Sequence, residues 1–403
     1  MNLEKIKERA QEINQEIVKW RRYLHQHPET GFDLPVTEAY LKKRLREDGI
    51  EVNKSYAGSG FTAVIRGEQG GSQEKTIAIR TDMDALNLQE SSRRDYASKL
   101  EGKMHACGHD AHMAMTLGAA RLLQEYRSSF SGQVKIIFQP AEEVGGGAKT
   151  LIKEGVLTDK PEVDAIIGTH IGNLWSLPSG QVGYRKGPLM AASDGFNLVI
   201  RGKGGHGARP QETVDALVVG AEVVTSLQNI VSRRIDPLDS AVISTGEFRA
   251  GSSHNIIAEK AEISATVRSL NSETREQLPE LIENVIKGVC LEMGADYELE
   301  YIYGPPVLKN DADFTDLFIE AAEEMLGGEN VVEISRPAMG GEDMAFFLQE
   351  VPGIFFGLGN VNPDKGTDIP HHNPEFDVDE DVLWIGSAVF TAVALKWLTE
   401  ISN

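Results

Sequence analysis

The chain has 403 residues and carries 61 acidic against 40 basic side chains, which gives a formal net charge of −21. Nucleic acid and anionic membrane surfaces attract basic proteins, so neither is an expected partner. The sequence has no run of the roughly 18 to 20 consecutive apolar residues that cross a bilayer, and its first residues lack the apolar core of a secretory signal. Its two cysteines exclude a disulfide scaffold, so we expect a cytoplasmic protein.

The first part of the chain predicts an α/β domain. Amphipathic helices are expected from about Leu3 to His25 and from Thr37 to Arg46, and a further helix from Ala111 to Tyr126. Short β-rich runs stand at Thr62–Ile65, Thr76–Ile79, Val134–Phe138 and Ala165–Ile167. Strands that alternate with helices predict a three-layer α/β/α domain with a largely parallel sheet. In such a sheet the chemistry lies beyond the carboxyl ends of the strands.

The middle of the chain has a different order of elements. Strand, helix, strand, strand, helix and strand are expected at Gly195–Arg201, Val214–Ile230, Ala241–Phe248, Ala261–Val267, Glu273–Cys290 and Tyr297–Tyr301. This β-α-β-β-α-β order is typical of a ferredoxin-like α+β domain. The α/β pattern then returns and ends in a long apolar helix from about Val382 to Leu398. We therefore predict a larger domain of residues 1–189 and 303–403, with a smaller domain of residues 190–302 inserted in it.

Side chains that bind metals gather in a few short segments. Cys107 and His109 are separated by one glycine, so both can point at one ion from a tight turn. A structural zinc site would need a second pair that contains cysteine, and the sequence has none. The other candidates follow predicted strands or lie near the C-terminus: Glu142, Glu143, His170, His371 and His372.

The number of these side chains favours two ions. One cysteine, one glutamate and three histidines exceed what a single catalytic zinc requires, whereas two ions that share a bridging ligand would use them all. The adjacent glutamates suggest that one binds metal while the other acts as the general base for water. Taken alone, each residue also has a structural interpretation, such as a small buried cysteine or a hydrogen-bonded histidine. Their joint occurrence favours the metal site.

Five segments together resemble one known family. They are Arg80–Leu86, Met104–Asp110, Gln139–Glu143, Gly202–His206 and Gly340–Asp343. In this order they are similar to the aminoacylase/carboxypeptidase family of dinuclear metallopeptidases. The Cys-Gly-His-Asp and Pro-Ala-Glu-Glu elements narrow the resemblance to the amidohydrolase branch, which contains hippurate hydrolases, N-acyl-amino-acid deacetylases and auxin–amino-acid conjugate hydrolases. The resemblance implies hydrolysis of the amide bond of N-acyl-L-amino acids to a carboxylic acid and a free amino acid.

The resemblance also implies the metal ligands, which are Cys107, His109, Glu143, His170 and His372. Cys107 stands where the wider family has a bridging aspartate, so a bridging thiolate is implied. His372 is preferred to His371 because Asn373-Pro374 follows it directly, as in the family pattern. The implied cofactors are two divalent ions per subunit, Mn²⁺ or Zn²⁺, with Co²⁺ and Ni²⁺ as further candidates.

Further roles follow from the same resemblance. Glu142 takes the position of the general base, and Asp84 matches an aspartate that orients a ligand. The inserted domain resembles a lid and dimerisation domain, which implies a homodimer or a higher homo-oligomer. Within it, His206 matches a histidine that stabilises the oxyanion, often in the partner's active site. Asn255 and Arg268 match positions that hold the substrate carboxylate.

Three other interpretations stay open. The first is a dipeptidase or exopeptidase on the same scaffold, although no residue is evident that would bind a free α-amino group. The second is a thiol hydrolase with Cys107 as nucleophile and His109 or His105 as base, which leaves the remaining candidate ligands without a role. The third is a non-enzymatic binding module on the same scaffold. Such a module would lack a ligand or the base, whereas here every expected position is filled.

Overall fold

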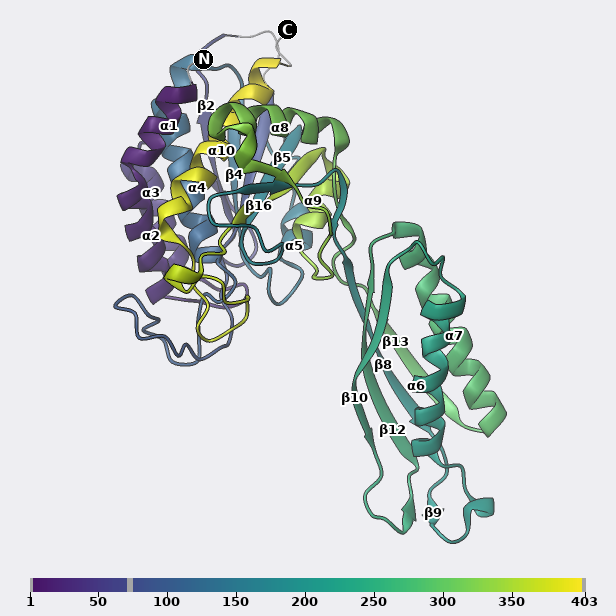
Figure 1. Cartoon of the computed structure of the whole chain (residues 1–403). Helices are drawn as coiled ribbons and strands as arrows, with labels where there is room; N and C mark the ends of the chain where they lie inside the picture. The colour runs from purple at the N-terminus through teal and green to yellow at the C-terminus, as the bar shows by residue number, and fades with distance from the viewer. Residues whose placement is uncertain (1–2, 71–74, 401–403) are drawn as a thin grey trace. The chain divides into compact units, whose positions relative to one another are not determined.

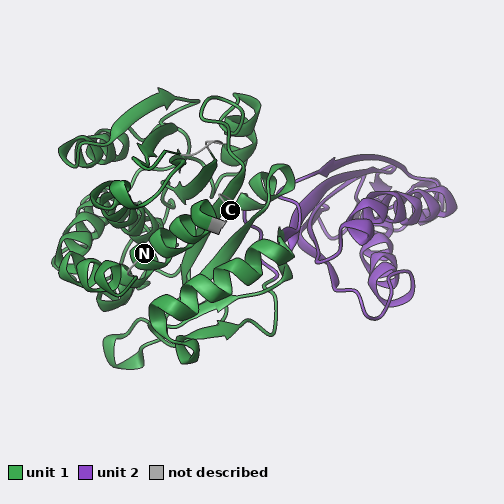
Figure 2. Cartoon of the chain, turned by 90° about the horizontal axis from the view of Figure 1, so that it is seen from above, with its two compact units in different colours: residues 1–189, 309–338, 343–403 green, residues 190–308, 339–342 purple. Residues whose placement is uncertain are grey.

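The computed structural model describes residues 3–70 and 75–400 and divides into two compact units (Figure 2). Unit 1 comprises Met1–Leu189, Lys309–Ala338 and Asp343–Asn403, and unit 2 comprises Met190–Leu308 and Met339–Glu342. Unit 2 thus extends beyond the expected insertion of residues 190–302. Backbone hydrogen bonds explain the difference, because the amides of Ala191 and Ser193 donate to the carbonyls of Gly340 (3.1 Å) and Pro305 (2.9 Å).

Unit 1 is built on a mixed eight-stranded sheet in the order β1-β2-β4-β3-β5-β16-β6-β15 (Figure 1). Its strands are β1 (Glu51–Ser55), β2 (Phe61–Arg66), β3 (Thr76–Asp82), β4 (Gln133–Gln139), β5 (Ala165–Gly172), β6 (Val182–Tyr184), β15 (Val331–Glu333) and β16 (Gly353–Gly359). The neighbours β4, β3, β5 and β16 are mutually parallel. Their carboxyl ends therefore share one edge, where Asp84, Glu143 and His170 are found. A separate two-stranded sheet joins β7 (Gly187–Met190) to β14 (Leu308–Asn310).

Helices cover both faces of the eight-stranded sheet, which confirms the predicted three layers (Figure 1). They are α1 (Leu3–Glu12), α2 (Asn14–Gln26), α3 (Pro35–Glu47), α4 (His109–Glu125), α5 (Gly147–Lys153), α8 (Ala312–Leu326), α9 (Met344–Glu350) and α10 (Leu383–Glu400). α4 and α8 both pack against α10, whereas α5 packs against α9. On β16, Ile354 and Phe356 join the main hydrophobic core, and Phe355 between them lies beside Gly168 and Met344 of α9. Alternate side chains of a strand thus serve opposite layers.

The prediction of one helix from Leu3 to His25 is wrong, because the structure has two helices that divide at Ile13. The next residue, Asn14, is buried and its side chain bonds to the segment that begins α10. Its Nδ2 donates to the carbonyl of Glu380 (3.1 Å), and its Oδ1 accepts from the amide of Trp384 (3.0 Å). The division therefore lies at a contact between residues far apart in the chain, which local periodicity does not report.

Among the described residues, one helical stretch, Glu380–Thr399, is long and apolar enough to cross a membrane by length and composition. However, 78% of an 18-residue segment within that stretch is buried inside the protein, where α10 packs against α4, α8 and α1. A central core helix meets the same criteria of length and hydropathy. The burial of α10 in the core therefore accounts for the apolar character of this stretch.

Unit 2 has the β-α-β-β-α-β order that the sequence predicts. Its elements are β8 (Ala192–Arg201), β9 (Gly205–His206), α6 (Ala216–Arg233), β10 (Ala241–Ala250), β11 (Ile256–Ile257), β12 (Lys260–Ser269), α7 (Ser272–Met293) and β13 (Asp296–Ile302). The main sheet is antiparallel with the order β10-β12-β8-β13, and β9 pairs with β11 beyond it. Asp215 and Asn271 cap the starts of α6 and α7 with side-chain oxygens.

Candidate metal centre

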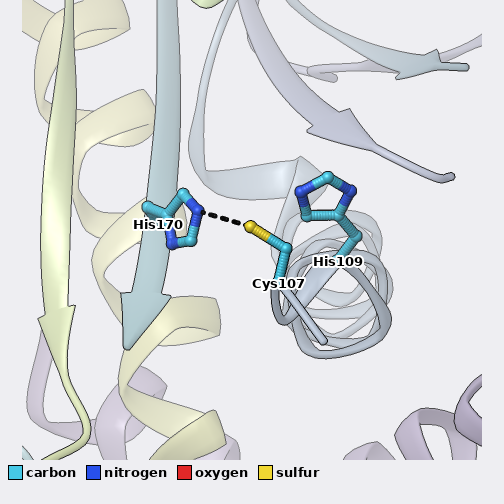
Figure 3. Close-up of side chains that lie close together, drawn as sticks. All are labelled: Cys107, His109 and His170. Atoms are coloured by element: carbon cyan, nitrogen blue, oxygen red, sulfur yellow. Dashed lines mark hydrogen bonds between the residues drawn. The ribbon is translucent and has the colours of Figure 1, made fainter. Parts of the chain in front are cut away.

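A tight turn at the start of α4 brings two candidate ligands to the edge of the sheet. Gly108 separates Cys107 from His109 and has a φ of +86°, a conformation that favours glycine. A Cβ atom at Gly108 would stand 3.1 Å from the Cγ2 atom of Ile171 on β5. In Figure 3, Cys107 points from this turn towards His170 of β5, and their Sγ and Nε2 atoms lie 3.4 Å apart.

Two groups of potential ligand atoms share Cys107. One contains Cys107, His109 and His170, and the other contains Cys107, Glu143 and His372; within each group the ligand atoms lie within 4.8 Å of one another. Thiolate, imidazole and carboxylate are donors that divalent transition metals accept. A shared thiol between two such groups fits two adjacent ions with a bridging ligand, so these residues suit a dinuclear centre.

Backbone carbonyls orient two of the histidines. His109 Nδ1 donates to the carbonyl of Asp84 (2.8 Å), and His170 Nδ1 donates to the carbonyl of Ile171 (2.9 Å). In both rings the proton therefore resides on Nδ1, and Nε2 is the atom that can bind a metal. The Nε2 atom of His109 lies 3.8 Å from Glu143 Oε1, so it faces the second group.

The adjacent glutamates are presented by a turn that follows β4. Ala141 adopts a φ of +61°, and the next two backbone amides bond to one carboxylate. The amides of Glu142 (2.9 Å) and Glu143 (3.1 Å) donate to the two oxygens of Asp84. Burial raises the pKa of Asp84 to about 7. Asp84 thus supports both the His109 ring, through its carbonyl, and the two glutamates, through its carboxylate.

The neighbouring histidines near the C-terminus face different partners. His371 donates through Nε2 to the carbonyl of Ile171 (3.1 Å). His372 has a φ of +59°, and its Nε2 lies 3.5 Å from Glu143 Oε1. Its amide donates to the carbonyl of Ala106, just before Cys107 (2.8 Å). The backbone turn therefore directs His372, rather than His371, towards the group around Glu143.

Burial sets the protonation of several of these groups. It lowers the pKa of His170 well below the ordinary value and that of His371 to about 4. Burial, followed by the charges of Glu143 and Glu142, raises the pKa of the Cys107 thiol. Neutral imidazole is the form that binds metal, and a thiol with a raised pKa becomes a thiolate when a metal replaces its proton.

These properties disfavour a thiol hydrolase in which His109 or His105 is the base for Cys107. A nucleophilic cysteine requires a lowered thiol pKa and an imidazole base within hydrogen-bond distance. The imidazole at that distance from Cys107 is His170, whereas the predicted bases were His109 and His105. The ring of His105 is fully buried, and burial lowers its pKa to about 3.

Asp82 and His112 are not among the site residues predicted from the sequence, yet both belong to this region. His112 Nδ1 lies 2.7 Å from Asp82 Oδ1, and these two residues with His109 form a further group of potential ligand atoms. Sequence signals existed for both, because Asp82 precedes Asp84 by two residues and His112 follows His109 by three. The second spacing places two histidines on one face of a helix.

The remaining predicted residues belong to unit 2, where the structure brings two of the three together. His206 on β9 and the exposed Asn255 lie side by side, since the amide of Gly207 donates to the Asn255 carbonyl (2.8 Å). Arg268 on β12 instead hydrogen-bonds to the Ser193 hydroxyl at the start of β8.

His206 follows the far end of that strand. Arg201 ends β8, and the chain then turns through glycines to β9. Ser193 and Arg201 are separated by eight residues of strand, which corresponds to about 26 Å at a rise of about 3.3 Å per residue. Arg268 and His206 therefore occupy opposite ends of unit 2. A joint contact of Asn255 and Arg268 from the same chain with one substrate carboxylate is excluded by this distance.

The chain is similar to known proteins over most of its length. Residues 78–396 match the family model described as peptidase family M20/M25/M40. Thermostable carboxypeptidase 2 of Saccharolobus solfataricus is 39% identical over 399 residues, which cover 98% of each chain. N-acyl-L-amino acid amidohydrolase of Geobacillus stearothermophilus is 42% identical over 315 residues, which cover 77% of this chain and 82% of that protein.

A solved structure extends the comparison to the whole fold. It is a Bacillus subtilis protein described as a dinuclear metal-binding peptidase from the M20 family. It superposes with a TM-score of 0.82 at 34% identity, and the match covers 96% of this chain and 98% of that one. Together with the two ligand groups that share Cys107, these similarities place the chain in peptidase family M20/M25/M40 as a hydrolase that acts on amide bonds.

Proposed function

We propose that this hydrolase cleaves the amide bond of N-acyl-L-amino acids and releases a carboxylic acid and a free amino acid. The observation that carries the proposal is the sharing of Cys107 between two ligand groups, with Glu142 adjacent to the ligand Glu143. This arrangement provides for metal-assisted hydrolysis with a separate general base. The similarity to an N-acyl-L-amino acid amidohydrolase supports the choice of substrate class.

The proposed ligands are Cys107, His109, Glu143, His170 and His372. Two divalent ions held by these residues would lower the pKa of a water molecule and polarise the scissile carbonyl. The mixed donor set suits Zn²⁺ and Mn²⁺, with Co²⁺ and Ni²⁺ as further candidates. Glu142 accepts the proton of the water on a carboxylate oxygen and passes it to the departing amine nitrogen. Asp84 keeps both glutamates in place by accepting from their amides.

The residues of unit 2 that complete one active site come from two subunits. Because Arg268 and His206 lie at opposite ends of that unit, we infer that one active site combines Arg268 of its own chain with the partner subunit's His206 and the partner subunit's Asn255. Arg268 binds the substrate carboxylate, and His206 donates to the oxyanion of the tetrahedral intermediate. One such donor contributes roughly 3 to 4 kcal/mol to transition-state stabilisation.

The surface of unit 2 supports a homodimer. β10 stands at the edge of the main sheet, so one side of this ten-residue strand is available for pairing. Phe248 on β10 is exposed and lies against Gly220 of α6, whose first turn exposes Leu217 and Val218. Exposed apolar side chains beside an edge strand are typical of association between copies of one chain.

The substrate class is tested by amino-acid release from N-acetyl-, N-benzoyl- and longer N-acyl-amino acids, compared with Ala-Ala and Gly-Gly. The protein is stripped with a chelator and reloaded separately with Mn²⁺, Zn²⁺ or Co²⁺. Release from N-acyl substrates that depends on the metal is the expected result. If the reloaded protein binds two ions but releases amino acids only from dipeptides, the proposal is wrong.

A peptidase is the second candidate function. The observation in its favour is the 39% identity to a protein named thermostable carboxypeptidase 2. The two functions share the metal centre and differ on the acyl side of the scissile bond. The same substrate panel separates them, because a peptidase would prefer Ala-Ala to N-acetylalanine.

A further inference from the structure

We propose that a buried chain of hydrogen bonds from Asp343 through Arg80, Asp82 and His112 positions the metal ligand His170. This inference rests on the proposed metal centre and assigns positioning roles to four residues that bind no substrate. All four side chains are buried in unit 1. They come from the end of β3, from α4 and from the residue before α9, so they join distant parts of the sequence.

The first links of this chain of hydrogen bonds are made by the guanidinium of Arg80, which connects Asp343 to Asp82. Its Nη2 donates to Asp343 Oδ1 (2.6 Å), its Nη1 to Asp82 Oδ2 (2.8 Å) and its Nε to Gln139 Oε1 (2.8 Å). Gln139 in turn donates to Asp343 through Nε2, and so does the amide of Ala148. Three hydrogen bonds thus hold the planar guanidinium group of Arg80, and its geometry determines where Asp82 lies.

The second link is His112, whose protonation follows from its partners. The backbone amide of Ile171 can only donate, so His112 Nε2 accepts its hydrogen bond (2.9 Å). Nδ1 must then carry the proton, which it donates to Asp82 Oδ1 (2.7 Å). One carboxylate oxygen of Asp82 accepts a hydrogen bond from Arg80, and the other accepts one from His112. The position of Asp82 therefore determines the position of the His112 ring.

The last link reaches the metal centre through the backbone of Ile171. While the Ile171 amide is held by His112, its carbonyl accepts from His170 Nδ1 (2.9 Å) and from His371 Nε2 (3.1 Å). The backbone of Ile171 thus connects His112 with the His170 ring, whose Nε2 points at Cys107. Outer partners that orient a metal-binding histidine typically contribute 10- to 100-fold to metal affinity.

Two substitutions at His112 test whether its hydrogen bond with the Ile171 amide matters for the metal centre. In His112→Asn, the amide nitrogen can replace Nδ1, but the acceptor for the Ile171 amide is lost. In His112→Gln, the amide oxygen can replace Nε2 and accept from Ile171. We expect His112→Asn to weaken the binding of one of two ions by about 10- to 100-fold, and His112→Gln to weaken it by less than about tenfold.

The measurement is the affinity for Zn²⁺ and Mn²⁺, determined by competition with a chelating dye, together with metal content per chain. The matched control is Asp194→Asn, which removes a buried ion pair with Arg275 in unit 2 (2.7 Å). Thermal unfolding is recorded for every variant. Equal metal affinity in His112→Asn, His112→Gln and Asp194→Asn would overturn the inference, because a general loss of stability would act on all three.

Asp343→Asn tests the chain of hydrogen bonds at the end opposite His112. It keeps the side-chain shape, so it also serves if His112→Asn does not fold. We expect it to weaken the same ion, since the charge opposite Arg80 is lost. Wild-type affinity for both ions in Asp343→Asn would contradict the proposal. If the wild-type chain itself binds no metal, the proposed function fails and this inference fails with it. If the wild type binds two ions and the variants match it, this inference alone fails.

Discussion

Glu142 and Glu143 are adjacent in the chain, and the proposed function gives them different roles. Glu143 Oε1 lies within 3.8 Å of His109 and 3.5 Å of His372, in a ligand group that contains Cys107. Glu142 is the proposed general base. We therefore expect Glu142→Gln to lower kcat by about 10²- to 10⁴-fold while two ions remain bound. The measurements are steady-state kinetics with an N-acetyl-amino acid and metal content per chain.

The control for this prediction is Glu143→Gln, which should lose metal because it removes a ligand. Loss of both ions in Glu142→Gln would instead identify Glu142 as a ligand. In that case the assignment of the two glutamates would be reversed.

Asp377 is a residue whose charge ties the C-terminal segment to α2. Its Oδ1 accepts from Arg21 Nη2 (2.7 Å), and its Oδ2 accepts from the Tyr96 hydroxyl (2.7 Å) and pairs with Arg94 (2.7 Å). Burial raises the pKa of Asp377, but Arg21, Tyr96 and Arg94 outweigh burial and hold the pKa below its ordinary value. The carboxylate therefore stabilises the folded protein at neutral pH.

The sign of the pH dependence follows from this lowered pKa. The stabilisation by Asp377 is complete above the unfolded pKa of about 3.9 and is lost as the pH falls towards the folded pKa. We expect Asp377→Asn to lower the free energy of unfolding by about 2 kcal/mol at pH 7. The difference from wild type should shrink below about pH 4. Urea unfolding at pH 7, 5 and 3.5 measures it, and a difference that stays constant with pH would contradict the ionic role.

At the scale of elements, the candidate metal centre depends on the turn that follows β4 on one side and the start of α4 on the other. Gly108 is decisive for the second, because its φ is +86° and a side chain there would press on Ile171. We expect Gly108→Ala to displace Cys107 or His109 and to weaken metal binding. Backbone strain alone costs about 1 to 2 kcal/mol for a residue other than glycine in this conformation.

Gly102→Ala is the matched control for the substitution at Gly108. Gly102 also has a positive φ, of +73°, but a Cβ atom there would meet nothing within 4 Å. The Gly102→Ala variant should therefore be less stable than wild type but bind metal with unchanged affinity. Urea unfolding and metal titration of both variants separate backbone strain from the contact with Ile171. Equal metal affinity in the two variants would show that this contact does not position the ligands.

At the scale of the whole molecule, the proposed active site needs two chains. Arg268 and His206 lie at opposite ends of unit 2, so the site would take one from each subunit. Arg268→Ala and His206→Ala should each be nearly inactive alone. In a heterodimer of the two variants, one site has both substitutions and the other has neither. We expect about half of the wild-type activity from that pair, because a closed dimer has two equivalent sites.

Co-expression of the variants with different affinity tags yields the heterodimer for kinetics, and light scattering gives its mass. A fully inactive heterodimer would show that both residues act within one chain. A monomeric wild-type protein would exclude the shared site altogether.

Local patterns predicted most of the architecture of this protein. Alternation of strands and helices indicated the three-layer domain, and the β-α-β-β-α-β order of unit 2 was readable because each element has its own periodicity. The division between α1 and α2 was missed since both segments continue one helical pattern. The division coincides with hydrogen bonds of Asn14 to Glu380 and Trp384, residues more than 360 positions away in the chain.

The sequence by itself determined which kinds of chemistry are available to this protein. Its cysteine, histidine and glutamate motifs specify potential metal ligands, because ligand chemistry belongs to the residue type. The tertiary structure decided which of them meet. The turn at His372 directs this residue, and not His371, towards Glu143, and the buried hydrogen bonds of His112 reach His170 through Ile171. Such relations depend on contacts between distant segments, and only the folded chain forms them.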